Sequence, residues 1–205
     1  MSKFYLSIFL LLLFGGGWWL SDSYTPATNK EAVPTTAPKP PEQYQVFDAD
    51  FEIPDVWVQD QHEENRRFTA LLDHEKAVFV QFMFTSCPTI CPVMSGHFAV
   101  FQEKIEEAKA DIQLLSVSID TKYDTPDRLA EYAEQFEAQP YWTFLTGKKE
   151  DIQKLQYAFD NYTDNKMSHR PVTFFRPPGS ASWKVFEGFV SGGALWEEYA
   201  RLNTL

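Results

Sequence analysis

Residues 4–20 form an apolar run near the start of the chain, preceded by one basic residue, Lys3. Its 17 residues are at the short end of what crosses a bilayer. Trp18 and Trp19 lie where an interfacial aromatic belt is expected. The run therefore predicts a membrane anchor over residues 1–20, with a cleaved signal peptide as the alternative. Either way, the basic tip favours export of the rest of the chain from the cytoplasm.

Residues 21–43 are rich in Pro, Thr and Ala and show no apolar periodicity. Such a segment buries too little apolar surface to offset the entropy of ordering it, so we expect a disordered tether. Residues 44–205 are long enough for one hydrophobic core and too short for two domains of ordinary size. The pattern thus predicts an anchor, a tether and one folded domain.

Within residues 44–205, short β-branched or aromatic runs alternate with amphipathic stretches. Strands are expected at 77–84, 112–119, 142–145, 172–175 and 183–189, with one or two edge strands in 45–60. Helices are expected near 92–108, 126–136, 151–159 and 195–202. This order predicts an α/β sandwich with a central mixed sheet flanked by helices, which matches a thioredoxin-like core.

Two helix starts are visible in the pattern. Apolar positions at helical spacing follow the second cysteine and indicate one buried face: Cys91, Met94, Phe98, Phe101, Ile105 and Ala108. Further along, Thr125 is typical of an N-cap and Pro126 of a first helical turn. A Pro-Pro-Gly turn at 177–179 separates the last two strands.

The formal net charge of −11 belongs entirely to the domain. Residues 1–43 hold three lysines and three acidic residues, which sum to zero. An acidic domain is a poor candidate for binding nucleic acid or anionic lipid, so neither is expected as a partner. The simplest consequence of this charge is solubility.

The two cysteines, Cys87 and Cys91, are only four residues apart. A disulfide across so short a loop constrains the unfolded chain little, so chemistry is a better explanation than stapling. We expect Cys87 in a loop after a central strand and Cys91 at the start of the following helix. Thiolates are stabilised at a helix N-terminus and are soft ligands for copper(I) or zinc.

Four histidines compete for the place of a third ligand. His62 and His74 lie in charged runs, and His97 lies off the apolar face of its helix, so surface positions are expected for all three. His169 directly precedes the 171–175 strand, whose entry loop approaches the cysteine loop in a thioredoxin-like fold. Met94 offers a thioether, but its place on the apolar face favours core packing. Spacing alone leaves the third ligand open.

The chain resembles the SCO/SenC family of copper-binding proteins over residues 45–200. The resemblance rests on FTSCPTICP at 84–92, SVSIDTKYDTP at 116–126 and the later His169. It implies a copper ion held by Cys87, Cys91 and His169.

The same resemblance implies delivery of copper to the dinuclear copper site of cytochrome c oxidase, or reduction of the cysteines of that site. The partner would be the copper-site subunit of the oxidase or another periplasmic thiol protein. A single-pass anchor would hold the protein in the inner (cytoplasmic) membrane, with the C-terminal domain facing the periplasm.

One departure from the family pattern keeps an enzymatic alternative open. Pro171 after Arg170 resembles the cis-proline of thioredoxins, which favours a thiol–disulfide oxidoreductase with Cys87 attacking and Cys91 resolving. Asp120 and Asp124 serve either turn formation and helix capping or a function near the site. A peroxiredoxin is excluded, because Val80 and Phe84 stand where P-x-x-x-T-x-x-C needs Pro and Thr.

Overall fold

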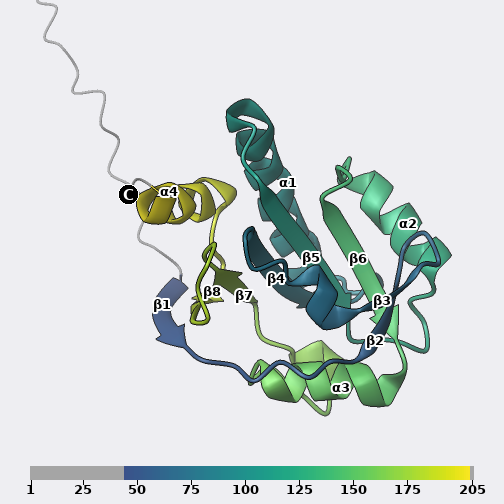
Figure 1. Cartoon of the computed structure of the whole chain (residues 1–205). Helices are drawn as coiled ribbons and strands as arrows, with labels where there is room; N and C mark the ends of the chain where they lie inside the picture. The colour runs from purple at the N-terminus through teal and green to yellow at the C-terminus, as the bar shows by residue number, and fades with distance from the viewer. Residues whose placement is uncertain (1–43, 204–205) are drawn as a thin grey trace, which may run out of the picture. The chain divides into compact units, whose positions relative to one another are not determined.

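The computed structural model describes residues 44–203, which form a mixed sheet with helices on both faces (Figure 1). The anchor and tether expected for residues 1–43 lie outside this range. Within residues 44–203, no helix has the length and apolar character needed to cross a bilayer.

The central strands of the sheet are parallel and its outer pairs antiparallel. The strands are β1 (Tyr44–Ala49), β2 (Trp57–Asp60), β3 (Asn65–Arg67), β4 (Ala77–Met83), β5 (Ile112–Ser118), β6 (Trp142–Gly147), β7 (Val172–Arg176) and β8 (Trp183–Gly188). Their order is β1-β8-β7-β4-β5-β6-β2-β3, with only the β4–β5 and β5–β6 pairs parallel. The predicted α/β sandwich with a mixed sheet is confirmed. Strand β3 was not predicted, because its Asn-Arg-Arg sequence has no apolar pattern.

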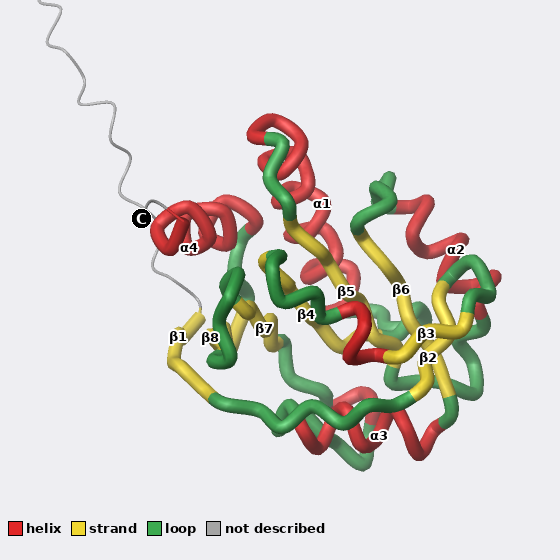
Figure 2. Tube along the Cα trace, in the orientation of Figure 1, coloured by secondary structure: helices red, strands yellow, loops and turns green. Residues whose placement is uncertain are grey.

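Helices α1, α2 and α4 cover one face of the sheet, and α3 covers the other (Figure 1). The bounds are α1 (Ile90–Ala108), α2 (Pro126–Gln135), α3 (Lys149–Ala158) and α4 (Gly192–Asn203), with 3-10 turns η1 (Phe68–Leu71) and η2 (Lys166–Ser168). The chain between β1 and β2 crosses the α3 face as an extended loop (Figure 2). Phe51 fixes this loop, since its ring lies 5.2 Å from Phe159 and 5.7 Å from Phe174.

Strand β4 is the centre of the core, and all seven of its residues are buried. Because both faces of the sheet are covered, its sequence reads as a continuous apolar run rather than an alternating one. Phe79 stacks on Phe175 of β7, with ring centroids 4.2 Å apart, and meets Phe101 of α1 edge-on at 4.7 Å. These contacts fix β7 and α1 against the strand that leads into the cysteine loop.

The two predicted helix starts are largely confirmed. Thr125 caps α2, and its hydroxyl accepts a hydrogen bond from the Arg128 amide at 3.4 Å. The predicted apolar face of α1 is buried from Cys91 to Ile105, but Ala108 is exposed. The face ends there because Lys109 takes a left-handed conformation (φ 51°) that closes the helix.

Gly192 allows α4 to approach the backbone of α1 closely. A Cβ at this position would lie 2.6 Å from the Phe101 amide nitrogen and closer still to the His97 carbonyl oxygen. Both obstacles are backbone atoms of a helix, so neither rotates away. A larger residue must therefore push the two helices apart.

We expect Gly192→Ala to lower the free energy of unfolding by about 1–3 kcal/mol, the usual cost of overpacking. Gly193→Ala is the matched control, since a Cβ there meets nothing closer than Ser191 Oγ at 4.0 Å. That substitution should leave stability unchanged or raise it by about 0.5–1 kcal/mol. Urea denaturation followed by circular dichroism measures both. Equal effects of the two substitutions would contradict the close helix packing.

Candidate metal centre

Both cysteines lie where sequence analysis placed them. Cys87 follows β4 in a loop whose turn is closed by a hydrogen bond from the Cys87 amide to the Phe84 carbonyl at 3.2 Å. Cys91 is the second residue of α1. Its amide donates to Cys87 Sγ at 3.4 Å, so the helix N-terminus points a free N–H at the first sulfur.

Strand pairing brings His169 to these sulfurs. The residue follows η2 and precedes β7, which pairs antiparallel with β4 and places Thr173 opposite Gln81. The start of β7 therefore lies beside the end of β4, where the cysteine loop begins. The sulfur atoms of Cys87 and Cys91 and one ring nitrogen of His169 all lie within 4.8 Å of one another.

The cluster is buried. Exposed fractions are 7 % for Cys87, 0 % for Cys91 and 6 % for His169. The shortest separation joins Cys91 Sγ to His169 Nε2 at 3.1 Å. Both thiols are free, so the cysteines are in the reduced form.

A backbone carbonyl fixes the tautomer of His169. Its Nδ1 lies 3.2 Å from the Arg170 carbonyl oxygen, which can only accept a hydrogen bond. Nδ1 therefore carries the proton, and the lone pair of Nε2 faces the Cys91 sulfur. Burial lowers the pKa of His169, against the raising effect of this hydrogen bond, so the imidazole is neutral near pH 7. A neutral ring with Nδ1–H held by a carbonyl is the usual state of a metal-binding histidine.

The two thiols have opposite pKa shifts. Burial alone would raise the pKa of Cys87, but hydrogen bonds from Cys91 and Thr89 outweigh it and the pKa lies below its ordinary value. Burial raises the pKa of Cys91, and the neighbouring Cys87 sulfur raises it further. The pair therefore loses its first proton from Cys87 and keeps the second on Cys91.

Both aspartates of the D-x-x-x-D sequence hold loops in place. Asp124 is fully buried and accepts hydrogen bonds from the Thr85 amide at 3.0 Å and hydroxyl at 2.6 Å, and from the Ser118 hydroxyl at 2.5 Å. It thus fastens the cysteine loop to the end of β5. Asp120 forms an ion pair with Lys166, three residues before His169. Sequence analysis had no signal for Lys166 other than its closeness to His169.

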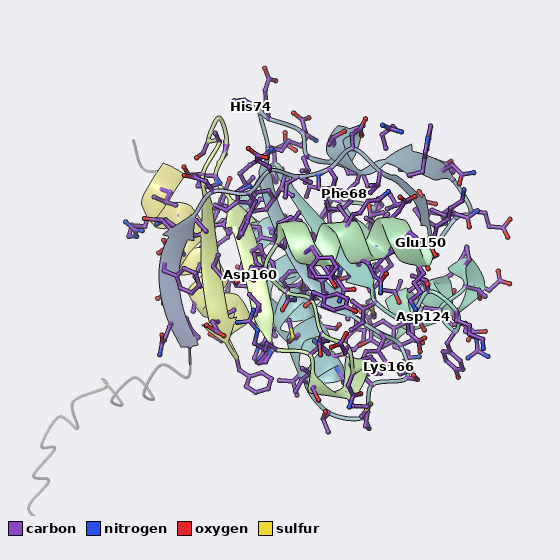
Figure 3. All side chains as sticks on the ribbon, turned by 90° about the horizontal axis from the view of Figure 1, so that it is seen from below. Phe68, His74, Asp124, Glu150, Asp160 and Lys166 are labelled. Atoms are coloured by element: carbon purple, nitrogen blue, oxygen red, sulfur yellow. The ribbon has the colours of Figure 1, made fainter. Side chains whose placement is uncertain are left out.

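The other histidines do not join the cluster. His62 and His74 are exposed as expected, and His74 lies on the opposite side of the domain from Lys166 (Figure 3). The prediction of a surface position for His97 is wrong. It is half-buried, its ring hydrogen-bonds the Val190 backbone, and burial lowers its pKa. The sequence did not reveal this, because the Val190 backbone reaches the His97 ring only in the folded chain.

Two further predictions concern neighbouring residues. Met94 is buried within α1, in agreement with core packing. The Arg170–Pro171 bond is trans, since no peptide bond in residues 44–203 is cis. The likeness to the thioredoxin cis-proline therefore does not hold, and with it goes the argument that it gave for disulfide exchange.

The donor set fits a soft metal ion. Two sulfurs and one imidazole nitrogen are the ligands that copper(I) and zinc prefer, whereas hard cations need oxygen. No carboxylate belongs to the cluster found among the described residues. Structural zinc sites usually have four protein ligands, and this cluster offers three. The chemistry of the side chains therefore favours copper(I).

Comparison with known proteins gives the family context. The sequence profile of the SCO1/SenC family matches residues 47–175. The SCO1 protein homolog of Bacillus subtilis (strain 168) is 37 % identical over 67 residues, which are 32 % of this chain and 35 % of that protein. The chain thus spans about a third of the length of that relative.

Solved structures show the same fold. BsSco, a member of the Sco family of cytochrome c oxidase assembly proteins with a disulfide switch, matches with a TM-score of 0.64 at 23 % identity, over 76 % of this chain and 95 % of that one. Arabidopsis thaliana ScoI, solved with copper bound, matches with a TM-score of 0.60 at 23 % identity, over 71 % of this chain and 93 % of that one.

The opposite pKa shifts predict an ordered reaction of the two thiols. Alkylation rates follow the thiolate fraction, so Cys87 should react with its midpoint below the pH of an ordinary thiol and Cys91 well above it. Mass spectrometry of the reduced protein after short iodoacetamide pulses at increasing pH measures both. Removal of the Cys91 thiol in Cys91→Ala should move the Cys87 midpoint upward, because this side chain helps to lower the pKa of Cys87. Equal reactivity of the two cysteines near pH 7 would contradict this assignment.

Proposed function

The chain belongs to the SCO1/SenC family, and from this premise we propose that it is an extracytoplasmic copper chaperone that carries copper(I) on Cys87, Cys91 and His169. The observation that carries the proposal is the convergence of these three buried donors, with the Nε2 lone pair aimed at the Cys91 sulfur. Two structural relatives support it, since Arabidopsis thaliana ScoI was solved with copper bound and BsSco is a member of a family of cytochrome c oxidase assembly proteins.

Loading begins at Cys87 in this proposal. Its thiol ionises first and is the least buried of the three donors. Cys91 must then give up its proton, so copper uptake releases protons and strengthens as the pH rises. His169 contributes a neutral nitrogen that is already in the binding tautomer. The buried surroundings limit the access of water and thus protect the copper(I) from oxidation.

Delivery would proceed by ligand exchange, with a cysteine thiolate of the partner replacing Cys87 first. We propose that the partner is the copper-site subunit of cytochrome c oxidase, or another periplasmic thiol protein. Residues 1–20 would anchor the protein in the cytoplasmic membrane and residues 21–43 would tether the domain in the periplasm. The acidic domain argues against nucleic acid as a partner.

Thiol–disulfide exchange is the second candidate, and the unequal thiols favour it. The Cys87 thiolate would attack a partner disulfide, form a mixed disulfide and release one partner thiolate. Cys91 would then lose its proton and attack Cys87 Sγ. The partner disulfide would gain two electrons and leave as two thiols. Cys87 and Cys91 would remain as a disulfide, which a dithiol reductant would have to reduce again. This activity would need no ligand from His169.

The His169→Ala substitution separates the two candidates. Titration of the reduced protein with copper(I) against a competing chelator should give one copper per chain for the wild type. Loss of a ligand should weaken affinity by at least about 100-fold, more than the about 10–100-fold cost of losing an outer partner. The Cys87–Cys91 dithiol should still oxidise reversibly.

His74→Ala is the matched control, since this residue is exposed and lies away from the site. It should bind copper as the wild type does. Wild-type affinity in His169→Ala would rule out the three-donor site. Loss of disulfide reduction together with unchanged copper binding would instead identify His169 as an acid–base group for exchange.

A further inference from the structure

Lys166 connects the histidine loop to two other parts of the metal centre. Its ammonium pairs with Asp120 and lies 4.9 Å from the centroid of the Phe84 ring. The Phe84 ring in turn meets the His169 ring edge-on, with centroids 5.8 Å apart. A continuous set of contacts therefore runs from Asp120 through Lys166 and Phe84 to the His169 imidazole. Figure 3 shows Lys166 on the same side of the domain as Asp124.

Asp120 is the fixed end of this set of contacts. Its side chain is only 14 % exposed, and its amide donates to the Ser118 hydroxyl at 3.0 Å. Its carbonyl accepts hydrogen bonds from the Tyr123 and Asp124 amides, both at 2.9 Å. The carboxylate thus stands on a turn that is closely joined to the end of β5.

The histidine loop has little packing of its own. No residue of η2 is buried, and Met167 is 55 % exposed. The Asn165 side chain accepts one hydrogen bond from the Met167 amide at 3.0 Å, which caps the short turn. Lys166 lines a cavity of about 310 Å³, so its side chain has room to leave the position it occupies. Electrostatic contacts rather than tight packing therefore hold the ammonium.

We propose that Asp120 and Lys166 are positioning residues that hold His169 Nε2 within reach of the Cys91 sulfur, an inference that rests on the proposed copper-binding function. The two aspartates then act on different loops: Asp124 holds the cysteine loop through Thr85, and Asp120 holds the histidine loop through Lys166. Ser118 joins them, because its hydroxyl donates to Asp124 and accepts from the Asp120 amide.

The first test is a charge removal with a rescue. Lys166→Met keeps the length of the side chain and removes its charge, so copper(I) affinity should fall by about tenfold, as for loss of an outer partner. Lys166→Arg keeps both the ion pair and the contact with the ring face, and should bind copper nearly as the wild type does. Lys149→Met is the matched control. This exposed lysine lines the same cavity and forms no ion pair with any residue in 44–203.

A double-mutant cycle separates positioning from a general effect. If Lys166 acts through His169, Lys166→Met should cause no further loss of affinity in the His169→Ala background. A loss of equal size in both backgrounds would overturn the inference, as would wild-type affinity in Lys166→Met itself. The thermal midpoint should change little, because the Lys166 side chain is 41 % exposed and an ion pair with one solvated partner contributes little stability.

Nuclear magnetic resonance of the metal-free, reduced protein gives a readout that needs no copper. The His169 ring signals should shift and broaden in Lys166→Met and in Asp120→Asn, and stay in place in Lys149→Met. Unchanged ring signals in the first two variants would contradict the positioning role. If the wild type bound no copper but the ring signals still moved, the proposed function would fail while the positioning of His169 stood.

Discussion

The antiparallel pairing of β7 with β4 is the constraint on which the metal centre depends. β4 leads into the cysteine loop and β7 begins just after His169, so the register that sets Thr173 opposite Gln81 also brings the imidazole to the sulfurs. The pairing is fixed by aromatic packing rather than by the site, chiefly by the stacked Phe79 and Phe175 rings. The core thus determines the geometry of donors that are distant in sequence, since Cys91 and His169 meet although 78 positions separate them.

Burial gives these donors their chemical character. It keeps His169 neutral and raises the pKa of Cys91, while hydrogen bonds at the start of α1 offset it at Cys87. The reduced site therefore holds one readily lost proton and one tightly held proton. A soft cation that replaces both would leave less uncompensated charge in the core than two bare thiolates would. The same difference between the pKa values of the two thiols suits disulfide exchange, in which Cys87 attacks and Cys91 resolves. One arrangement therefore supports both candidate functions.

Periodicity was enough to predict the elements that carry the cysteines. The apolar β4 run and the 3–4 spacing of α1 are local patterns, and they placed Cys87 in a loop and Cys91 at a helix start. His169 was different, because spacing left the third ligand open and only the resemblance to a family identified it. Other contacts join segments that are distant in sequence, so no local pattern encodes them. These are the Asp124–Thr85, Asp120–Lys166 and His97–Val190 contacts. β3 was missed because its Asn-Arg-Arg sequence has no apolar pattern, and its arginines contact Asp60 and Trp57 of β2 only in the folded chain.

X-ray absorption spectroscopy of the copper(I)-loaded protein tests the central claim most directly, since it identifies the atoms bound to the metal. The account predicts one copper per chain with two sulfur neighbours and one imidazole nitrogen, and loss of the nitrogen signal in His169→Ala. A first shell of three or more sulfurs, or of nitrogen and oxygen alone, would contradict a site built from Cys87, Cys91 and His169.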